Sequence, residues 1–303
     1  MRALLMVALL AGSAFANTPV QRPEAIEVDR DTTPPGQAEM GFESGAPIGD
    51  YAFGLTLTEL ERPIRIHTLE LVSYPVKRRE TATLGGAIAL GDDVIVDAKV
   101  AVSHQVGRRY QNLGDDRPLD PWVPNDAQLG ARVHVMTRGA LAVFVRANIT
   151  IPTGDDHDFA GDASWSAAWS GIARLTLPHD LTLAATGGIR IRGAEVQVAD
   201  LLIGDELFWA AGATVGIPPF CSLWCSADQF KVEAEVVGIL GDRVAHLRGP
   251  SPIEGRVGVV GRLRPHYTIA ARVGTQLDDQ LGAPQFRATL DLVYHQGRYH
   301  QGR

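Results

Sequence analysis

From about residue 51 to residue 294, the chain is a succession of segments of roughly ten residues in which apolar and polar side chains alternate. Between Leu141 and Ile151 every second residue is apolar, whereas Arg146 and Asn148 occupy positions between them. Because successive side chains of a strand point to opposite faces, one face of such a strand is apolar and the other is polar. The pattern therefore predicts a chain built almost wholly of amphipathic β-strands.

The alternation and the turn residues between segments predict about twelve strands. We expect them near residues 50–58, 80–90, 93–105, 126–137, 140–152, 162–176, 180–193, 205–217, 229–240, 253–264, 266–276 and 285–294. Short and long links alternate between them, as in outer-membrane barrels with short periplasmic turns and longer external loops. The link between the eighth and ninth predicted strands is an exception, because it lies on the short-turn side but is longer than the other turns there. The prediction is an all-β fold, a transmembrane antiparallel up-and-down β-barrel over residues 50–294.

A soluble β-sandwich also has alternating strands and is the main structural alternative. Sandwich strands are usually about five or six residues long. The strands predicted here are longer, and Gly and Ala are frequent on their apolar faces. No stretch approaches the roughly 20 apolar residues of a membrane-spanning helix. These observations favour the barrel.

The two ends of the chain lack the alternation. Residues 1–16 combine a basic start, an apolar run and the small-x-small site at 14–16, which is typical of a cleaved signal peptide. Residues 17–49 are rich in proline and charge, which predicts a flexible periplasmic segment; the alternative is a plug folded into the lumen. Residues 295–303 form a short basic repeat, which we expect to be a solvated C-terminal tail.

Several short motifs carry a resemblance to known proteins. They are LGGAIALGDDVIVDA at 84–98, QLGARVHV at 128–135, NITIPTGDDHDFAGD at 148–162, GDELFW at 204–209 and LGAPQFRATLDLVY at 281–294. In these stretches the chain resembles the barrel portion of myxobacterial and other proteobacterial OmpA-like outer-membrane proteins. It is also similar to the transporter-like barrels named after the MetA pathway of phenol degradation. The resemblance implies a location in the outer membrane of a Gram-negative bacterium and insertion by the barrel-assembly machinery, to which the aromatic Tyr294 would serve as a signal. It does not extend to a peptidoglycan-binding domain, so we expect no anchoring to the cell wall.

The polar faces of the predicted strands carry the candidate functional residues. The basic ones are Lys99, Arg132, Arg146, Arg174, Arg190, Arg192, Lys231, Arg256, Arg262, Arg264, Arg272 and Arg287, and the acidic ones are Asp97, Glu206, Glu233, Glu235, Glu254 and Asp291. This basic excess contrasts with the formal charge of −7 of the whole chain. Rings of Arg and Lys lower the barrier for anions, which predicts a porin-like pore for passive transport of small solutes, with anionic ones favoured.

The alternative function is a structural or surface-display barrel that does not conduct, because paired side chains fill its lumen. Barrels of about eight strands are filled by side chains, whereas those of about sixteen or more enclose an aqueous channel. Twelve strands lie between these limits, so the strand count leaves both functions open.

Other candidate chemistry is sparse. Cys221 and Cys225 are the only cysteines, and export permits a disulfide between them, whereas two thiols without nearby histidines fall short of a zinc site. His157 lies beside Asp155 and Asp156, but the spacing does not match a dedicated calcium loop. No serine lies at a useful spacing from a histidine. We expect no metal, no cofactor and no enzymatic activity. The acidic chain also argues against nucleic acid and leaves outer-membrane lipid as the expected partner.

Overall fold

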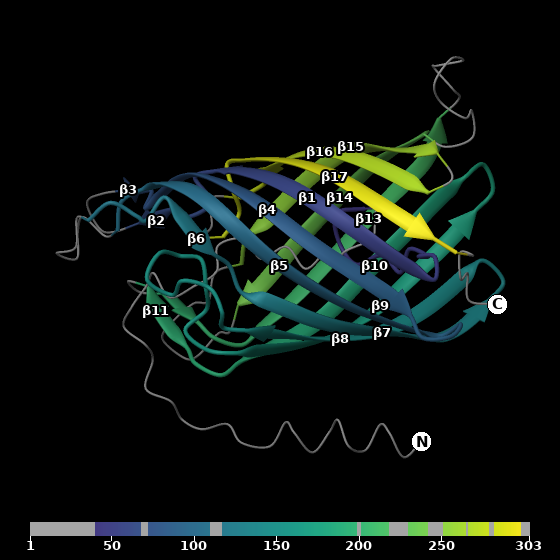
Figure 1. Cartoon of the computed structure of the whole chain (residues 1–303), viewed down its shortest axis with the longest axis horizontal. Helices are drawn as coiled ribbons and strands as arrows, with labels where there is room; N and C mark the ends of the chain where they lie inside the picture. Colours follow the sequence, from purple (N-terminus) through teal and green to yellow (C-terminus); the bar gives the residue numbers. More distant parts are fainter. Residues whose placement is uncertain are drawn as a thin grey trace.

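The computed structural model describes residues 40–67, 72–109, 117–198, 201–217, 230–241, 251–264, 266–278 and 282–297. The strands of these residues wrap into one cylinder and cross its axis obliquely (Figure 1). In the described part of the chain, no helix has both the length and the apolar character needed to cross a membrane.

Twelve long antiparallel strands form the wall of the cylinder. They are β1 (Tyr51–Glu61), β4 (Val76–Ala89), β5 (Val94–Gly107), β7 (Ala127–Arg138), β8 (Leu141–Ile151), β9 (Ser166–Leu177), β10 (Leu181–Arg192), β13 (Glu206–Ile217), β14 (Phe230–Gly241), β15 (Ile253–Arg264), β16 (Tyr267–Gln276) and β17 (Phe286–Gln296). Each long strand pairs with the next one along the chain, and β17 pairs with β1, which closes the ring. The predicted up-and-down barrel of about twelve strands is confirmed.

The long and short links lie at opposite ends of the barrel. Five short strands belong to the long links: β2 (Ile66–His67), β3 (Val72–Ser73), β6 (Trp122–Pro124), β11 (Val196–Val198) and β12 (Leu201–Ile203). They gather at the left end of the cylinder in Figure 1. At the other end the described turns between β4 and β5, β7 and β8, and β9 and β10 are tight, and Gly139 adopts a φ of +59° between β7 and β8. Glycine suits this position because it has no Cβ to clash in the left-handed region.

Several strand boundaries differ from the prediction by up to four residues, and two of them show the reason. The strand β4 begins at Val76 rather than near residue 80, because Val76 and Arg78 pair with the far end of β5. The strand β17 continues to Gln296, so the first two residues of the predicted solvated tail are part of the sheet. His295 is buried and its N–H donates to the carbonyl oxygen of His266. Pairing with a neighbouring strand, which the local pattern does not reveal, extends both elements.

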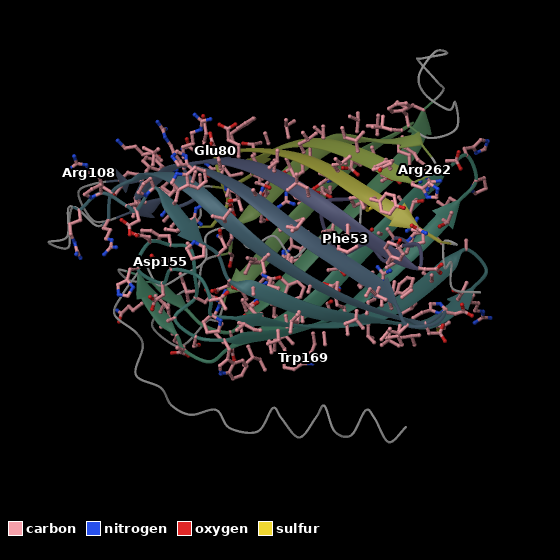
Figure 2. The ribbon with its side chains drawn as sticks, in the orientation of Figure 1. Phe53, Glu80, Arg108, Asp155, Trp169 and Arg262 are labelled. Atoms are coloured by element: carbon pink, nitrogen blue, oxygen red, sulfur yellow. The ribbon has the colours of Figure 1, made fainter. Side chains whose placement is uncertain are left out.

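The outward face of the barrel is apolar around its middle. Phe53, Leu84, Val100, Ile149 and Leu290 are among the many large apolar side chains that remain exposed there. Side chains project outward in this way along the whole cylinder in Figure 2. An apolar exterior with a polar interior is what hydrocarbon requires of a transmembrane barrel.

Charged side chains reach the outward face at the long-link ends of β1, β4 and β5. There Arg78 forms ion pairs with Glu59 and Glu80 at 2.9 and 2.5 Å, and His104 lies 3.6 Å from Glu80. The strands β4 and β5 are each 14 residues long, the longest in the barrel. Their extra length carries these charged groups beyond the apolar band.

Aromatic side chains mark the short-turn edge of the apolar band. Tyr51 and Tyr267 both lie against Tyr294, with ring centroids 6.3 and 5.2 Å apart. The hydroxyl groups of Tyr51 and Tyr294 both contact the side-chain oxygen of Gln296. Amphipathic rings of this kind are favoured where a membrane meets water.

Residues 40–49 lie inside the barrel. Met40, Phe42, Ala46 and Ile48 are each 3% exposed or less. This differs from the flexible periplasmic segment predicted over 17–49 and agrees with the plug alternative for these ten residues. The segment has no strand-like alternation, so its burial follows only from the space that the strand side chains leave in the lumen. Residues 1–39, including the predicted signal peptide, lie outside the described residues.

Candidate functional site in the lumen

Buried ion pairs connect adjacent and next-but-one strands along the lumen face of the wall. Arg146 on β8 makes a bidentate contact with Asp97 on β5, from Nη1 to Oδ2 at 2.7 Å and from Nη2 to Oδ1 at 2.8 Å. The Glu43 carboxylate of the inserted segment accepts a hydrogen bond from Arg132 Nη1 at 2.8 Å, and its other oxygen lies 3.3 Å from Arg146 Nη1. Gly130 leaves room for the guanidinium, since a Cβ there would lie 2.2 Å from Arg146 Nη2.

A second cluster joins β14, β15 and β17. Glu254 accepts hydrogen bonds from Arg256 at 2.9 and 3.1 Å and from Arg287 at 2.8 Å. Arg256 also lies 3.5 Å from Glu235. Each guanidinium therefore has a carboxylate partner, as buried charges require.

Two further arginine clusters complete the described lumen. Arg272 on β16 lies between Glu233 and Asp291 and forms ion pairs with both. Arg190 on β10 donates to Glu206 at 2.7 Å. The strands of each cluster are adjacent or next but one in the sheet.

The inserted segment is held in the lumen by its backbone as well as by Glu43. The N–H groups of Met40 and Gly41 donate to Glu233 at 2.9 Å and to Glu235 at 2.6 Å. Arg256 donates to the carbonyl oxygen of Gly41 at 3.1 Å. Around these contacts lie two cavities of about 80 and 70 Å³, and Gly41 and Arg256 line both. Each has room for several water molecules.

The predicted lumen residues divide into two groups. The buried charged side chains of the predicted set are the basic Arg132, Arg146, Arg190, Arg192, Arg256, Arg272 and Arg287 and the acidic Asp97, Glu206, Glu233, Glu235, Glu254 and Asp291. Glu43 of the inserted segment adds a seventh buried carboxylate beside these seven arginines. Lys99, Arg174, Lys231 and Arg262 are on the lumen face but only half-buried. The last three lie near the short-turn end of the barrel.

The predicted set lacked three charged side chains. Glu43 belongs to the segment without periodicity, and no sequence signal marked it. Asp162 follows β8 in a long link and pairs with Arg192. Arg79 is fully buried near the start of β4 and donates to Gln105 and to the carbonyl oxygen of Asp158. Arg79 is two residues before Thr81 and therefore shares its lumen face, which was the available signal in the sequence. The predicted strand began at about residue 80, one residue too late to include Arg79.

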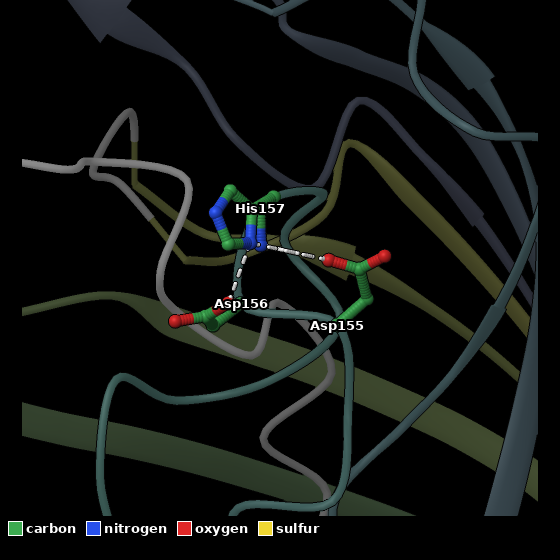
Figure 3. A group of neighbouring side chains, drawn as sticks. All are labelled: Asp155, Asp156 and His157. Carbon is green, nitrogen blue, oxygen red and sulfur yellow. Dashed lines mark hydrogen bonds and ion pairs between the residues drawn. The ribbon is translucent and has the colours of Figure 1, made fainter.

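The acidic loop after β8 contains the side chains that could hold a metal ion. His157 Nδ1 lies 2.7 Å from Asp156 and 3.8 Å from Asp155 (Figure 3), and the three side chains are partly exposed. The deeper carboxylate, Asp158, accepts hydrogen bonds from Arg109 Nε at 2.9 Å and from the Asp120 N–H at 3.2 Å. The buried carboxylate of the loop, Asp158, is therefore already hydrogen-bonded to other protein groups, and the remaining acidic side chains form a solvated surface.

Asp126, which directly precedes β7, fixes the two ends of the same loop. Its carboxylate accepts hydrogen bonds from the N–H groups of Gly154 and Asp162, both at 2.8 Å. Burial, together with the nearby Asp162 charge, raises the pKa of Asp126 to about 6 in spite of these hydrogen bonds. The loop geometry is thus coupled to a group that titrates near neutral pH.

The predicted disulfide between Cys221 and Cys225 falls outside the described residues and stays a prediction. Both cysteines lie in the sequence between β13 and β14.

Comparison with known proteins supports the fold. No protein-family model matches the chain, and no curated protein matches it in sequence. Among solved structures, an outer membrane channel from Pseudomonas putida F1 has a TM-score of 0.62 at 12% identity, over 85% of this chain and 99% of the other. The NanC porin has a TM-score of 0.53 at 7% identity, over 80% of this chain and 99% of the other.

These similarities agree with the apolar exterior and place the chain among bacterial outer-membrane barrels. The predicted location in the outer membrane is confirmed. At such low identities the likeness establishes the fold alone. The more specific resemblance to OmpA-like or phenol-degradation barrels stays a prediction.

Proposed function

We propose that the protein is a passive channel for small solutes and that residues 40–49 hold it closed in this structure. The observation that carries the proposal is the nature of the closure. The lumen wall is polar along the described strands, and the element that crosses it at mid-height is a chain segment outside the sheet. No backbone hydrogen bond of a strand pair has to break for the segment to leave.

The alternative function, a scaffold with a permanently filled lumen, is favoured by the buried ion pairs. Those pairs join strands that are adjacent or next but one in the sheet, however, and hold the wall rather than bridging the open width of the barrel. In a barrel of about eight strands, the side chains of the strands fill the lumen, and the diameter grows with the number of strands. A ring of twelve strands therefore encloses space beyond that limit. The segment occupies part of that extra space, which supports a removable closure more than a solid core.

Gly41 offers a way to test the closure without changing any charge. A Cβ at Gly41 would lie 2.5 Å from Glu235 Oε1 and 3.1 Å from an Arg256 nitrogen. Gly41→Leu should therefore expel this part of the segment from the lumen. A matched control is Gly171→Leu on β9, where a Cβ meets nothing within 4 Å.

The measurement is single-channel conductance of the full-length protein in planar bilayers. Gly41→Leu should raise the open fraction by at least about tenfold over the wild type, equivalent to a loss of roughly 1.4 kcal/mol in segment binding. Gly171→Leu should behave like the wild type. Electrically silent Gly41→Leu barrels that are correctly folded, as judged by their altered gel mobility without heating, would support the scaffold.

The charge preference of the open channel is a separate part of the proposal. Lys99 lines the cavity beside the threonines of β1 and β4, and Arg174 and Arg262 lie towards the short-turn end. We infer a preference for anions from this half-buried basic set. In the Gly41→Leu background, Lys99→Glu should move the reversal potential in a salt gradient towards that of cations. An unchanged reversal potential would exclude Lys99 from the selectivity of the channel.

We infer that the protein is a channel rather than an enzyme. His157, the histidine of the acidic loop after β8, is partly exposed and lies 2.7 Å from Asp156 and 3.8 Å from Asp155. Neither of these neighbours is a serine that could act as a nucleophile. A hydrolase assay on the full-length protein, compared with His157→Ala, would reveal an activity that this inference does not expect.

A further inference from the structure

The inserted segment is bound in the lumen as a peptide is bound by a receptor. Two of its N–H groups, from Met40 and Gly41, donate to wall carboxylates, and two of its carbonyl groups, from Gly41 and Ala46, accept from wall arginines. Its acidic side chain, Glu43, meets two guanidinium groups. Backbone donors, backbone acceptors and a carboxylate are thus all recognised.

The recognition has two poles of opposite charge. The acidic pole is Glu233 and Glu235 on β14, which accept the segment's N–H groups. The basic pole is Arg132 and Arg146 on β7 and β8, which hold the Glu43 carboxylate. In the strand order β7-β8-β9-β10-β13-β14, the two poles belong to separate parts of the wall. A ligand that satisfies both must carry donors at one end and a carboxylate further along.

Between the poles the lumen accepts apolar side chains. Met40 and Phe42 pack against Ala184 on β10 and Ala210 on β13 in a small buried cluster. The small wall residues leave a recess for a large side chain of the bound chain. The middle of the lumen therefore combines an apolar contact with the two charged poles.

We propose that this mid-lumen site binds short acidic peptides as solutes of the channel, and that residues 40–46 are its tethered competitor. The proposal rests on the proposed channel function, because a solute reaches the site only when the segment has left. Removal of Glu43 leaves two arginines against the single carboxylate of Asp97 at the basic pole, which attracts an incoming carboxylate. At the acidic pole, the Glu233 and Glu235 oxygens that accept the segment's N–H groups would accept those of a peptide's amino terminus, while Arg272 and Arg256 remain their ion-pair partners.

Tethering explains why the site is occupied in this structure. A ligand joined to its site by a short chain has an effective concentration in the millimolar range. A free peptide at micromolar concentration therefore competes poorly with residues 40–46 in the wild type. It should bind readily once Gly41→Leu has weakened the tethered copy, since this change leaves every wall charge in place.

The experiment adds synthetic peptides to full-length Gly41→Leu in planar bilayers. The probe is MGFESGAPI, which copies residues 40–48, and the matched control is MGFQSGAPI, in which glutamine replaces the glutamate. The glutamate peptide should block the current at a concentration at least about tenfold lower than the glutamine peptide, because a charge-assisted pair with Arg132 and Arg146 is lost. Free glutamate at the same concentration should not block.

Each other outcome overturns the proposal in a distinct way. Equal block by both peptides would exclude recognition of the carboxylate, and equal block by free glutamate would mean a carboxylate site without peptide recognition. If the Gly41→Leu barrel folds but never conducts, the channel function fails instead. Binding is then measured directly by fluorescence anisotropy of labelled MGFESGAPI on the detergent-solubilised variant, where equal affinity for the glutamine peptide would overturn the site itself.

Discussion

The outward and inward faces of the same twelve strands are stabilised by different kinds of interaction. Outward side chains such as Leu57 and Leu290, which are neighbours on β1 and β17, need only be apolar, and no particular partner is required. Inward side chains are specific: Arg272 requires Glu233 and Asp291, which lie on β14 and β17. The outer face therefore tolerates exchange within one chemical class, whereas each inner position depends on named partners.

The largest expected effect comes from breaking a buried pair on the inner face. Arg272→Met leaves the Glu233 and Asp291 carboxylates without their shared cation, and loss of one partner of a buried pair destabilises by about 3–5 kcal/mol. Urea unfolding in lipid vesicles measures the change. The control Arg78→Met removes an outward arginine whose side chain is 53% exposed and should change stability by less than about 1 kcal/mol. Equal effects of the two changes would contradict the division between the faces.

A charge on the outer face should give the next largest effect. Leu290→Arg lies in the middle of β17, and an arginine facing lipid at mid-height destabilises a barrel by about 2–4 kcal/mol. Val106→Arg is the matched change near the long-link end of β5, beside Arg78, where the effect should fall to about 0–1 kcal/mol. The same unfolding assay applies. A large loss for Val106→Arg would mean that the hydrocarbon band extends to that level.

The inserted segment belongs to neither face of the sheet, so its effect on stability can be compared with that of the inward ion pairs. Phe42→Ala removes apolar contacts with Ala184 and Ala210 but no strand pairing. We expect the midpoint of barrel unfolding to change by less than it does for Arg272→Met, while a cysteine placed at Ser44 becomes accessible to a thiol reagent at least several-fold faster. A midpoint shift as large as that of Arg272→Met would show that the segment is part of the folding core.

The smallest effect concerns the loop that Asp126 fixes at the rim of the inner face. Because the pKa of Asp126 is raised to about 6 from 3.8, its folded state binds a proton more tightly than its unfolded state does. The stability that this group contributes is thus present below about pH 4 and is lost as the pH rises through about 6. Hydrogen exchange in residues 152–165 should be slower at pH 5 than at pH 7 after correction for the intrinsic rate. Asp126→Ala should remove this dependence, and a dependence that persists would assign it to another group.

The sequence predicted the parts of the molecule that depend on a local pattern. Alternation identified the twelve strands and their lipid-facing residues, because hydrocarbon and a polar lumen act on every second side chain. The candidate lumen residues Arg132, Arg146 and Arg272 are inward-facing for the same reason. Lys99, Arg174, Lys231 and Arg262 are on the predicted lumen face but only half-buried, a difference in depth that alternation does not reveal. Glu43, which pairs with Arg132, lies in a segment without alternation.

The topology, the orientation of each strand's two faces and the location in a membrane follow from the order and polarity of neighbouring residues, so they could be inferred before the fold was known. The pairing of charges and the content of the lumen depend on contacts between distant residues, so they became apparent only in the folded barrel. Partners such as Glu43 and Arg132, or Met40 and Glu233, are far apart in the chain and meet only after the ring has closed. Ring closure brings them together because it fixes strand neighbours and lumen width, neither of which is encoded within a single strand.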